Sequence, residues 1–363
     1  MQAILVAPHK AGAHMGRVPE PVPGPDEVKV RVLECGICGL DRAIVAGRYG
    51  APPEGRSDMV LGHENLGKVV QVGESVRGLR VGDEVVATVR RGCGICRSCR
   101  TNRPDFCETG MFTERGIKGR DGYLSEFYVE RPEYLVRVPR PHRLSAVLLE
   151  PLSVAEKAVM QARRVLDRTE VTPGANGSRP RTALVSGTGA LGVLATLVLA
   201  EEGFEVTTVD RQADDNGTAK LFAVIGTRHA RVSSVLTDRA RARFDLILDT
   251  TGSARLDFEL TSLLGPNSVL VVTGSPADPA TEIPVPAGAI LNRLLLQNQA
   301  IVGSVRANRR YFEIGLRHLT AFRRRWGTVA EQLVSRRLPW TEFAPVLSGA
   351  GPKGIKTVLT IEN

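Results

Sequence analysis

The stretch "RTALVSGTGALGVLATLVLAEEGFEVTTVD" (residues 181–210) decides the fold of the second half of the chain. An apolar, strand-like run leads directly into Gly187, Gly189 and Gly192, which form a G-x-G-x-x-G pattern at the start of an apolar helical segment. Glycines at these places permit a tight turn and a close approach of the backbone to a pyrophosphate, and the helix N-terminus offers free N–H groups to it. The pattern therefore predicts a dinucleotide-binding site on a strand–turn–helix unit.

The second strand of this stretch ends at Asp210, and Arg211 follows it. A carboxylate roughly twenty residues after the glycines accepts hydrogen bonds from the adenosine ribose and repels a 2′-phosphate, which favours NAD. A guanidinium beside it can instead pair with a 2′-phosphate or stack on the adenine. NAD and NADP therefore both stay open, and Arg211 is equally compatible with an ordinary loop arginine.

Apolar strands and helical segments continue to alternate after residue 210, as in "FDLILDTTG" (244–252), "NSVLVVTGS" (267–275) and "AIVGSV" (300–305). This alternation predicts an α/β fold with a doubly wound parallel sheet, which we assign to residues 156–305. The Gly- and Pro-rich segment 171–181 is expected to be an exposed loop.

Residues 1–155 have a different character, because short β-type runs such as "EVKVRVLECG" (27–36), "LGKVVQVG" (66–73) and "GDEVVATV" (82–89) alternate with Gly and Pro. We predict a second, mostly β domain there. A helical stretch at 311–326 and a final strand in "GIKTVLTIE" are expected to return to it, so residues 306–363 complete this domain.

The composition limits the class of protein. The 363 residues are 42% hydrophobic and 24% charged, and they contain no apolar run of the ~18 residues that a membrane helix needs. The start "MQAILVAPHKAG" lacks the features of a signal peptide, so we expect a cytoplasmic protein with reduced thiols. The net charge of +9 is interspersed with acidic residues, so we expect no nucleic-acid or membrane partner.

Four of the six cysteines, Cys93, Cys96, Cys99 and Cys107, follow a C-x2-C-x2-C-x7-C pattern in a lobe at about 90–110. One loop with this spacing can wrap a tetrahedral ion, and four thiolates leave no coordination position open, as in a structural zinc site. The spacing differs from the ferredoxin patterns of iron–sulfur proteins. We therefore predict a structural zinc in this lobe.

Potential ligands of a second metal are spread along the chain: Cys38 in "ECGICGLD", His63 and Glu64 in "LGHE", and Glu150 in "LLEPL". One thiolate, one imidazole and one carboxylate leave a fourth position open for water or substrate, as a catalytic zinc requires. Each of these residues alone also has a structural interpretation, as a small buried residue, a loop histidine or a charge at a helix N-terminus. Cys35 has no further ligand nearby in the sequence and is interpreted as structural.

Together these features resemble the zinc-dependent medium-chain dehydrogenase/reductase superfamily over nearly the whole chain. The shared pattern includes "VRVLECGICGLD" (30–41), "GHENLGKVVQVG" (62–73), "VGDEVV" (81–86), the four-cysteine lobe and the glycine motif. Within the superfamily the chain is similar to the glucose 1-dehydrogenases best known from archaea, in residues 89–127, in "PEYLVRVP" (132–139) and in "EPLSVAEKA" (150–158).

The resemblance implies a GroES-like catalytic domain, a Rossmann cofactor domain and a catalytic zinc held by Cys38, His63 and Glu150. Glu64 would be an occasional ligand or would act through water, and Glu114 would contact sugar hydroxyls. The resemblance also implies a homodimer or homotetramer joined near the edge strand "AIVGSV".

Three positions depart from that group. Leu40 stands where the family usually has a threonine whose hydroxyl faces the substrate and passes on a proton. Arg306 in "VRAN" (305–308) replaces an asparagine that borders nicotinamide and sugar, and Tyr311 stands where a histidine is common. A long cation at position 306 either clashes with a sugar or recruits an anionic group.

We therefore predict a zinc-dependent enzyme that transfers a hydride from a sugar to NAD(P), with glucose as the leading substrate and a lactone as the product. Another polyol, an amino sugar or a secondary alcohol is the alternative substrate, motivated by Leu40 and Arg306. A non-catalytic nucleotide-binding protein is the alternative of a different class. The set Cys38, His63 and Glu150 argues against it, because such a protein has no use for three ligands around an open site.

Overall fold

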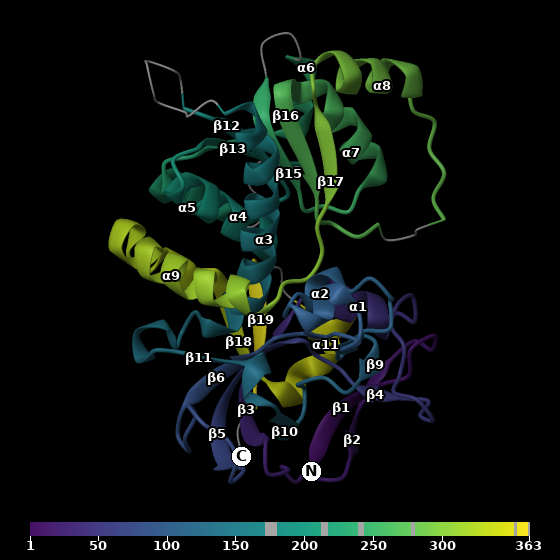
Figure 1. The fold of residues 1–363 in the computed structure, drawn as a ribbon, viewed down its shortest axis with the longest axis vertical. Coiled ribbons are helices and arrows are strands. Elements are labelled where there is room, and N and C mark those ends of the chain that lie inside the picture. Colours follow the sequence, from purple (N-terminus) through teal and green to yellow (C-terminus); the bar gives the residue numbers. More distant parts are fainter. Residues whose placement is uncertain (171–179, 212–216, 239–242, 277–279, 352–353, 362–363) are drawn as a thin grey trace. The chain divides into compact units, whose positions relative to one another are not determined.

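The structure is a computed structural model that describes residues 1–170, 180–211, 217–238, 243–276, 280–351 and 354–361. The chain forms two compact units (Figure 1). Unit 1 comprises Met1–Ser153, Arg306–Thr320 and Ala330–Asn363, and unit 2 comprises Val154–Val305 and Ala321–Val329. Most of the loop predicted at 171–181 lies outside the described residues.

Unit 1 is built on a seven-stranded, mainly antiparallel sheet with the order β11-β6-β5-β3-β19-β18, in which β10 also pairs with β3. Its strands are β3 (Val28–Ile37), β5 (Glu64–Val72), β6 (Glu84–Ala87), β10 (Phe127–Glu130), β11 (Leu135–Arg137), β18 (Val334–Pro339) and β19 (Lys356–Thr360). The runs predicted as strands at 27–36, 66–73 and 82–89 are confirmed as β3, β5 and β6. The chain's last strand, β19, is paired directly with β3.

Two smaller sheets and several short α-helices also belong to the described part of this unit. One sheet has the order β2-β1-β4 and the other β7-β8-β9. Their strands are β1 (Gln2–Val6), β2 (Ala13–Arg17), β4 (Met59–Val60), β7 (Arg90–Arg91), β8 (Thr113–Arg115) and β9 (Gly119–Arg120). The short helices are α1 (Gly39–Val45), α2 (Arg97–Arg100) and α11 (Phe343–Ser348), and α10 (Val329–Gln332) begins at the last residue assigned to unit 2.

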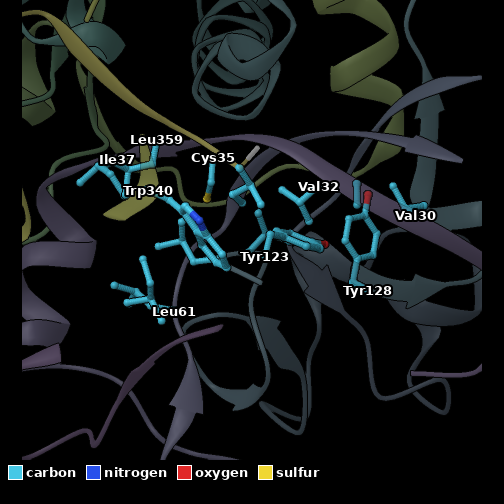
Figure 2. Packing of buried hydrophobic residues seen from close by; sticks show 14 of the residues in the cluster. Val30, Val32, Cys35, Ile37, Leu61, Tyr123, Tyr128, Trp340 and Leu359 are labelled. Carbon is cyan, nitrogen blue, oxygen red and sulfur yellow. The ribbon is translucent and has the colours of Figure 1, made fainter. Parts of the chain in front are cut away.

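The core of unit 1 forms because one face of its central strand is apolar at every second residue. Val28, Val30 and Val32 on β3 are completely buried, which is the period of a strand with one side on a core. Figure 2 shows this cluster, to which Trp340 and Cys35 also contribute. Cys35 is thus part of the apolar packing beside the candidate site.

Unit 2 contains a six-stranded parallel sheet with the order β14-β13-β12-β15-β16-β17. The strands are β12 (Thr182–Ser186), β13 (Glu205–Asp210), β14 (Arg228–Arg231), β15 (Phe244–Asp249), β16 (Leu264–Val272) and β17 (Ala300–Gly303). In chain order this is 3-2-1-4-5-6, the order of a dinucleotide-binding doubly wound sheet. The predicted α/β fold with a doubly wound parallel sheet is therefore confirmed.

Helices lie on both sides of this sheet, with α4 and α5 on one side and α7 on the other (Figure 1). They are α4 (Ala190–Glu201), α5 (Thr218–Ile225), α6 (Val232–Thr237), α7 (Ala254–Leu260) and α8 (Ala287–Leu296), together with the longer α3 (Leu149–Leu166) and α9 (Arg309–Trp326), which each run from one unit into the other. In the described ranges, no helix combines the length and the apolar character needed to cross a membrane.

Candidate functional site

Cys38 and His63 form the centre of a candidate metal site in unit 1. Cys38 lies between β3 and α1, and its Sγ accepts the backbone N–H of Leu40 (3.2 Å), which stabilises a thiolate. The distance from Cys38 Sγ to His63 Nε2 is 3.4 Å. Zinc bonds of roughly 2.3 Å to sulfur and 2.1 Å to nitrogen at a tetrahedral angle imply a separation of roughly 3.6 Å, so this pair fits a shared zinc ion.

The other ring nitrogen of His63 contacts a buried carboxylate. Asp41 is completely buried, and its Oδ1 lies 3.1 Å from His63 Nδ1 while its Oδ2 accepts the N–H of Cys38 (2.9 Å). Burial lowers the pKa of His63, but the charges of Asp41 and Cys38 outweigh it, so that the net shift is upward. A carboxylate behind a metal-binding histidine fixes the ring and leaves Nε2 free to bind, so Asp41 suits the same interpretation.

Glu64 joins this group but has a strong competing partner. The ligand atoms of Cys38, His63 and Glu64 all lie within 4.8 Å of one another. Both carboxylate oxygens of Glu64 also accept hydrogen bonds from Lys356 Nζ, at 2.6 and 2.7 Å. The two side chains meet across β3 at Gly36, where a Cβ would lie only 2.1 Å from Glu64 Oε2. Glu64 is therefore held beside the candidate metal position by a buried ion pair.

Glu150 lies in the first turn of α3 and is buried, with a relative exposure of 5%. It is not in the group of ligand atoms within 4.8 Å of one another formed by Cys38, His63 and Glu64. Burial raises its pKa, and the net shift is upward although the charge of His63 opposes it. The carboxylate has no hydrogen-bond partner among the described residues, so it is available to a cation.

Leu40 and Arg306, the two departures at the predicted substrate site, have different surroundings. Leu40 is half-buried and packs against the core cluster of unit 1. Arg306 Nε donates to Glu114 Oε1 at 2.8 Å, and Arg90 Nη2 approaches the same oxygen at 2.9 Å. Burial raises the pKa of Glu114, but the charges of Arg306 and Arg90 outweigh it and lower the pKa. One carboxylate is therefore shared by two guanidinium groups.

Cys93, Cys96, Cys99 and Cys107 converge with their sulfur atoms within 4.8 Å of one another. Backbone N–H groups of Cys96 and Cys99 donate to Cys93 Sγ and Cys96 Sγ, both at 3.4 Å. A hydrogen bond from Thr109 lowers the pKa of Cys93 to about 6, whereas burial and Cys96 raise the pKa of Cys99 to about 12. A divalent cation would hold all four as thiolates, so the cluster fits a closed zinc site.

The three glycines predicted to approach a pyrophosphate lie between β12 and α4 in unit 2. Gly187 has φ +103°, and a Cβ on Gly192 would lie 2.0 Å from the carbonyl oxygen of Gly187, so only glycine fits at either place. Gly189 caps α4, and a Cβ there would meet no atom within 4 Å. This turn leaves open space at a helix N-terminus, which fits a dinucleotide.

Asp210 ends β13, as predicted, and its Oδ2 accepts hydrogen bonds from the backbone N–H (3.2 Å) and the hydroxyl of Thr188. The backbone N–H of Arg211 donates to Asp210 Oδ1 at 2.5 Å, and Arg211 is exposed. Residues 212–216, which follow, lie outside the described residues. Asp210 is thus oriented beside the glycine turn.

Asp41, Lys356 and Arg90 are not among the residues that the sequence predicts for the site. Asp41 had a usable signal, because it stands three residues after Cys38 at the start of a helix, where a carboxylate caps the backbone. Lys356 had none, since 292 residues separate it from Glu64. The pairing of both β5 and β19 with β3 brings the two side chains together.

Comparison with known proteins agrees with this geometry. The chain matches the sequence families described as "Glucose dehydrogenase C-terminus" over residues 144–361 and "Alcohol dehydrogenase GroES-like domain" over residues 24–140. It is 39% identical over 343 residues to the glucose 1-dehydrogenase of Methanocella arvoryzae, covering 93% of each chain. It is 36% identical over 344 residues to the glucose 1-dehydrogenase of Thermoproteus tenax, covering 94% of each chain.

Among solved structures, the chain is similar to the glucose dehydrogenase of Haloferax mediterranei in complex with NADP, zinc and gluconolactone. The TM-score is 0.86 at 31% identity, and the match covers 100% of both chains. Because the family match spans more than half of the chain and the curated relatives match almost all of it, the chain belongs to the glucose dehydrogenase family of the zinc-dependent medium-chain dehydrogenases.

Proposed function

We propose that this oxidoreductase transfers a hydride from the anomeric carbon of an aldose to NAD+ or NADP+ while the proton of the anomeric hydroxyl is released, leaving a lactone. The observation that carries the proposal is the pair Cys38 and His63, whose 3.4 Å separation suits a single zinc ion. The similar glucose dehydrogenase of Haloferax mediterranei, solved with NADP, zinc and gluconolactone, supports the same chemistry.

The proposed zinc ligands are Cys38, His63 and Glu150, with Glu64 as a nearby carboxylate. Zinc at this position would supply a Lewis acid that lowers the pKa of a substrate hydroxyl. Asp41 holds the His63 ring in orientation through its Nδ1 contact of 3.1 Å. Lys356 binds both oxygens of Glu64. This ion pair favours a position of Glu64 outside the set of zinc ligands, so that Glu64 does not compete with Glu150 for the metal.

Substrate binding in this proposal involves Glu114. Its Oε1 accepts from two arginines, whereas its Oε2 has no hydrogen-bond partner among the described residues. A free carboxylate oxygen in a mostly buried position is a good acceptor for a sugar hydroxyl. Leu40 brings no hydroxyl to the site, so we assign it an apolar contact and no part in moving the substrate proton.

The proposed cofactor site comprises Gly187, Gly189, Gly192, Asp210 and Arg211 in unit 2. The open space at Gly189 and the N-terminus of α4 suit a pyrophosphate. NAD(P) at this place would supply the hydride acceptor. Asp210 favours the unsubstituted ribose of NAD, whereas Arg211 favours the 2′-phosphate of NADP. The assay therefore uses each cofactor separately.

The test measures zinc per chain together with absorbance at 340 nm during oxidation of glucose, galactose and xylose. We expect two zinc ions per chain, and for Cys38→Ser the loss of turnover with one zinc retained and cofactor affinity nearly unchanged. Cys35→Ser is the matched control, because Cys35 is fully buried in the core and contributes no sulfur to the site. Unchanged turnover in Cys38→Ser, or no oxidation of any sugar or alcohol, would contradict the proposal.

We also propose that the chain forms a homodimer or homotetramer through β17 and α8. β17 is the edge strand of its sheet, and Ile301 on it is 42% exposed. Leu291 and Leu295, one turn apart on α8, are 63% and 76% exposed. An edge strand beside exposed leucines is a common self-association surface. Light scattering of Leu295→Asp should show a smaller assembly than the unaltered protein, and an unchanged mass would contradict this assignment.

A cytoplasmic location is proposed from the cysteines. All six are free thiols, and a reducing compartment keeps potential zinc ligands in that form. Thiol labelling of cells denatured at once in the presence of a metal chelator tests this, because disulfides formed in an oxidising location would leave the cysteines unreactive.

A further inference from the structure

We propose that Arg306 selects an anionic sugar, so that the preferred substrate is an aldose carrying a phosphate or carboxylate group away from its anomeric carbon. This inference rests on the proposed function and narrows its substrate class. It makes Arg306 a specificity-determining residue in unit 1.

The first observation is an excess of positive charge. Arg306 Nε and Arg90 Nε donate to the same oxygen of Glu114, at 2.8 and 3.0 Å. The three side chains are only 13%, 8% and 4% exposed, respectively for Arg306, Arg90 and Glu114. Two guanidinium groups therefore share one carboxylate oxygen in a mostly buried place, where charged groups need partners.

The second observation separates the two arginines. Arg90 is fully engaged, because its Nη1 donates to the carbonyl oxygen of Asp105 (3.3 Å) and its guanidinium stacks on the Phe112 ring, 3.8 Å from the ring centroid. Arg306 uses only Nε, and no described residue accepts a hydrogen bond from its Nη1 or Nη2. The unused donors therefore belong to Arg306, whose Nη1 and Nη2 form a two-pronged donor of the geometry that phosphate and carboxylate groups bind.

The third observation is the position of Arg306 relative to the candidate zinc ligands. Burial lowers the pKa of Arg306, but the charges of Glu114, Glu150 and Cys38 outweigh it, so this guanidinium interacts electrostatically with two of the proposed zinc ligands. In the proposed enzyme the Glu150 carboxylate would bind zinc, so its negative charge would interact with the metal and not neutralise Arg306. The nearby carboxylate of Asp105 accepts from Asn308 at 2.8 Å and lies 3.9 Å from Arg103, so it already has partners.

The backbone adds a fourth point. Arg306 has φ +54°, in the left-handed region that few residues other than glycine adopt. The ion pair with Glu114 fixes the direction of the guanidinium. Residues whose backbone is held in such a sparsely populated conformation recur at binding sites.

The experiment uses the zinc-loaded enzyme and compares kcat/KM for glucose, xylose, glucose 6-phosphate and glucuronate with saturating NAD and, separately, NADP. A charge-assisted pair of hydrogen bonds corresponds to roughly a ten- to hundredfold preference for the anionic sugar over glucose. Glucose 6-phosphate and glucuronate distinguish a phosphate from a carboxylate as the recognised group. We expect Arg306→Asn to abolish this preference and Arg306→Lys to keep part of it.

Arg309→Asn is the matched control. Arg309 lies three residues after Arg306 and is 45% exposed, so its substitution removes the same charge from the surface. It should keep the preference for the anionic sugar.

The inference would be overturned if glucose and xylose were oxidised at least as efficiently as both anionic sugars, and this result would leave the proposed function intact. An effect of Arg306→Asn on the KM of NADP alone would also overturn it, whereas the absence of oxidation of every aldose would refute the proposed function itself. Zinc content of each variant shows whether it has folded, and Arg306→Lys remains informative where Arg306→Asn has not.

Discussion

Replacing Lys356 by methionine should destabilise unit 1 strongly, because it leaves the Glu64 carboxylate buried without its partner. Lys356 Nζ lies 2.6 and 2.7 Å from the two oxygens of Glu64, and the side chains are only 3% and 2% exposed. Removing one member of a buried ion pair costs roughly 3–5 kcal/mol of folding free energy, because the remaining charge is uncompensated. The double variant Lys356→Met/Glu64→Gln removes that charge and should recover about half of the loss.

Fluorescence of Trp340 can follow this loss during unfolding by urea. The chain has two tryptophans, of which Trp340 is 5% exposed in the core of unit 1 (Figure 2) and Trp326 belongs to unit 2. In a Trp326→Phe background the signal therefore reports on unit 1. With a slope of about 2 kcal/mol per molar urea, Lys356→Met should lower the midpoint by roughly 1.5–2.5 M.

Lys29→Met is the matched control, since its partner Glu20 is half-exposed and stays accessible to water when the lysine is removed, so the midpoint should be nearly unchanged. The reasoning is refuted by a double variant no more stable than Lys356→Met alone. That result would mean that the cost arises from lost packing of the lysine stem and not from the unpaired carboxylate.

Three further outcomes follow from the same structure. Gly189→Ala should fold normally, since its Cβ would meet no atom within 4 Å, yet should weaken cofactor binding measured by NADH fluorescence, and unchanged affinity would place the pyrophosphate elsewhere. Burial raises the pKa of Glu130, but Arg91 and Arg115 outweigh it and lower the pKa from 4.5 to about 2. Ionised Glu130 therefore contributes about 3 kcal/mol to the folding free energy above pH 4.5, and this contribution is lost as the pH falls towards 2. In Glu130→Gln the free energy of unfolding should fall less steeply on acidification than in the unaltered protein, as measured by unfolding at a series of pH values. Cys99→Ser should reduce zinc from two ions per chain to one and lower the melting temperature, and two ions retained would remove the four-cysteine cluster as a zinc site.

The parts of the structure that local sequence determines could be predicted. The strand before Gly187, the helix after Gly189 and the strand ending at Asp210 lie within one continuous stretch, where each local preference agrees with the fold. The four cysteines likewise belong to one short loop, so their spacing alone limits the coordination they can provide. Hydrophobic periodicity also located β3 and β5 to within two residues at their ends.

The partners that set the charge of the site could not be predicted in this way. The distances along the chain from Glu64 to Lys356 and from Glu114 to Arg306 are 292 and 192 residues. No periodicity or short motif connects positions so far apart, because they meet only through the order of strands in a sheet or the return of the chain to unit 1. Sequence analysis therefore identified candidate ligands but could not show which of their charges are already neutralised.

The arrangement separates the groups proposed for the reaction from those proposed for recognition. Cys38, His63 and the buried Asp41 behind the histidine keep the donor set that a catalytic zinc needs. Arg306 instead alters the charge around Glu114, the acceptor proposed for sugar hydroxyls. A metal site tolerates few changes of its ligands, whereas a recognition site can replace one contact by another. The residues around Glu114 therefore favour an enzyme that keeps the reaction of its relatives but acts on a different substrate. The comparison of glucose with glucose 6-phosphate is therefore the measurement that separates shared chemistry from shared substrate within this family.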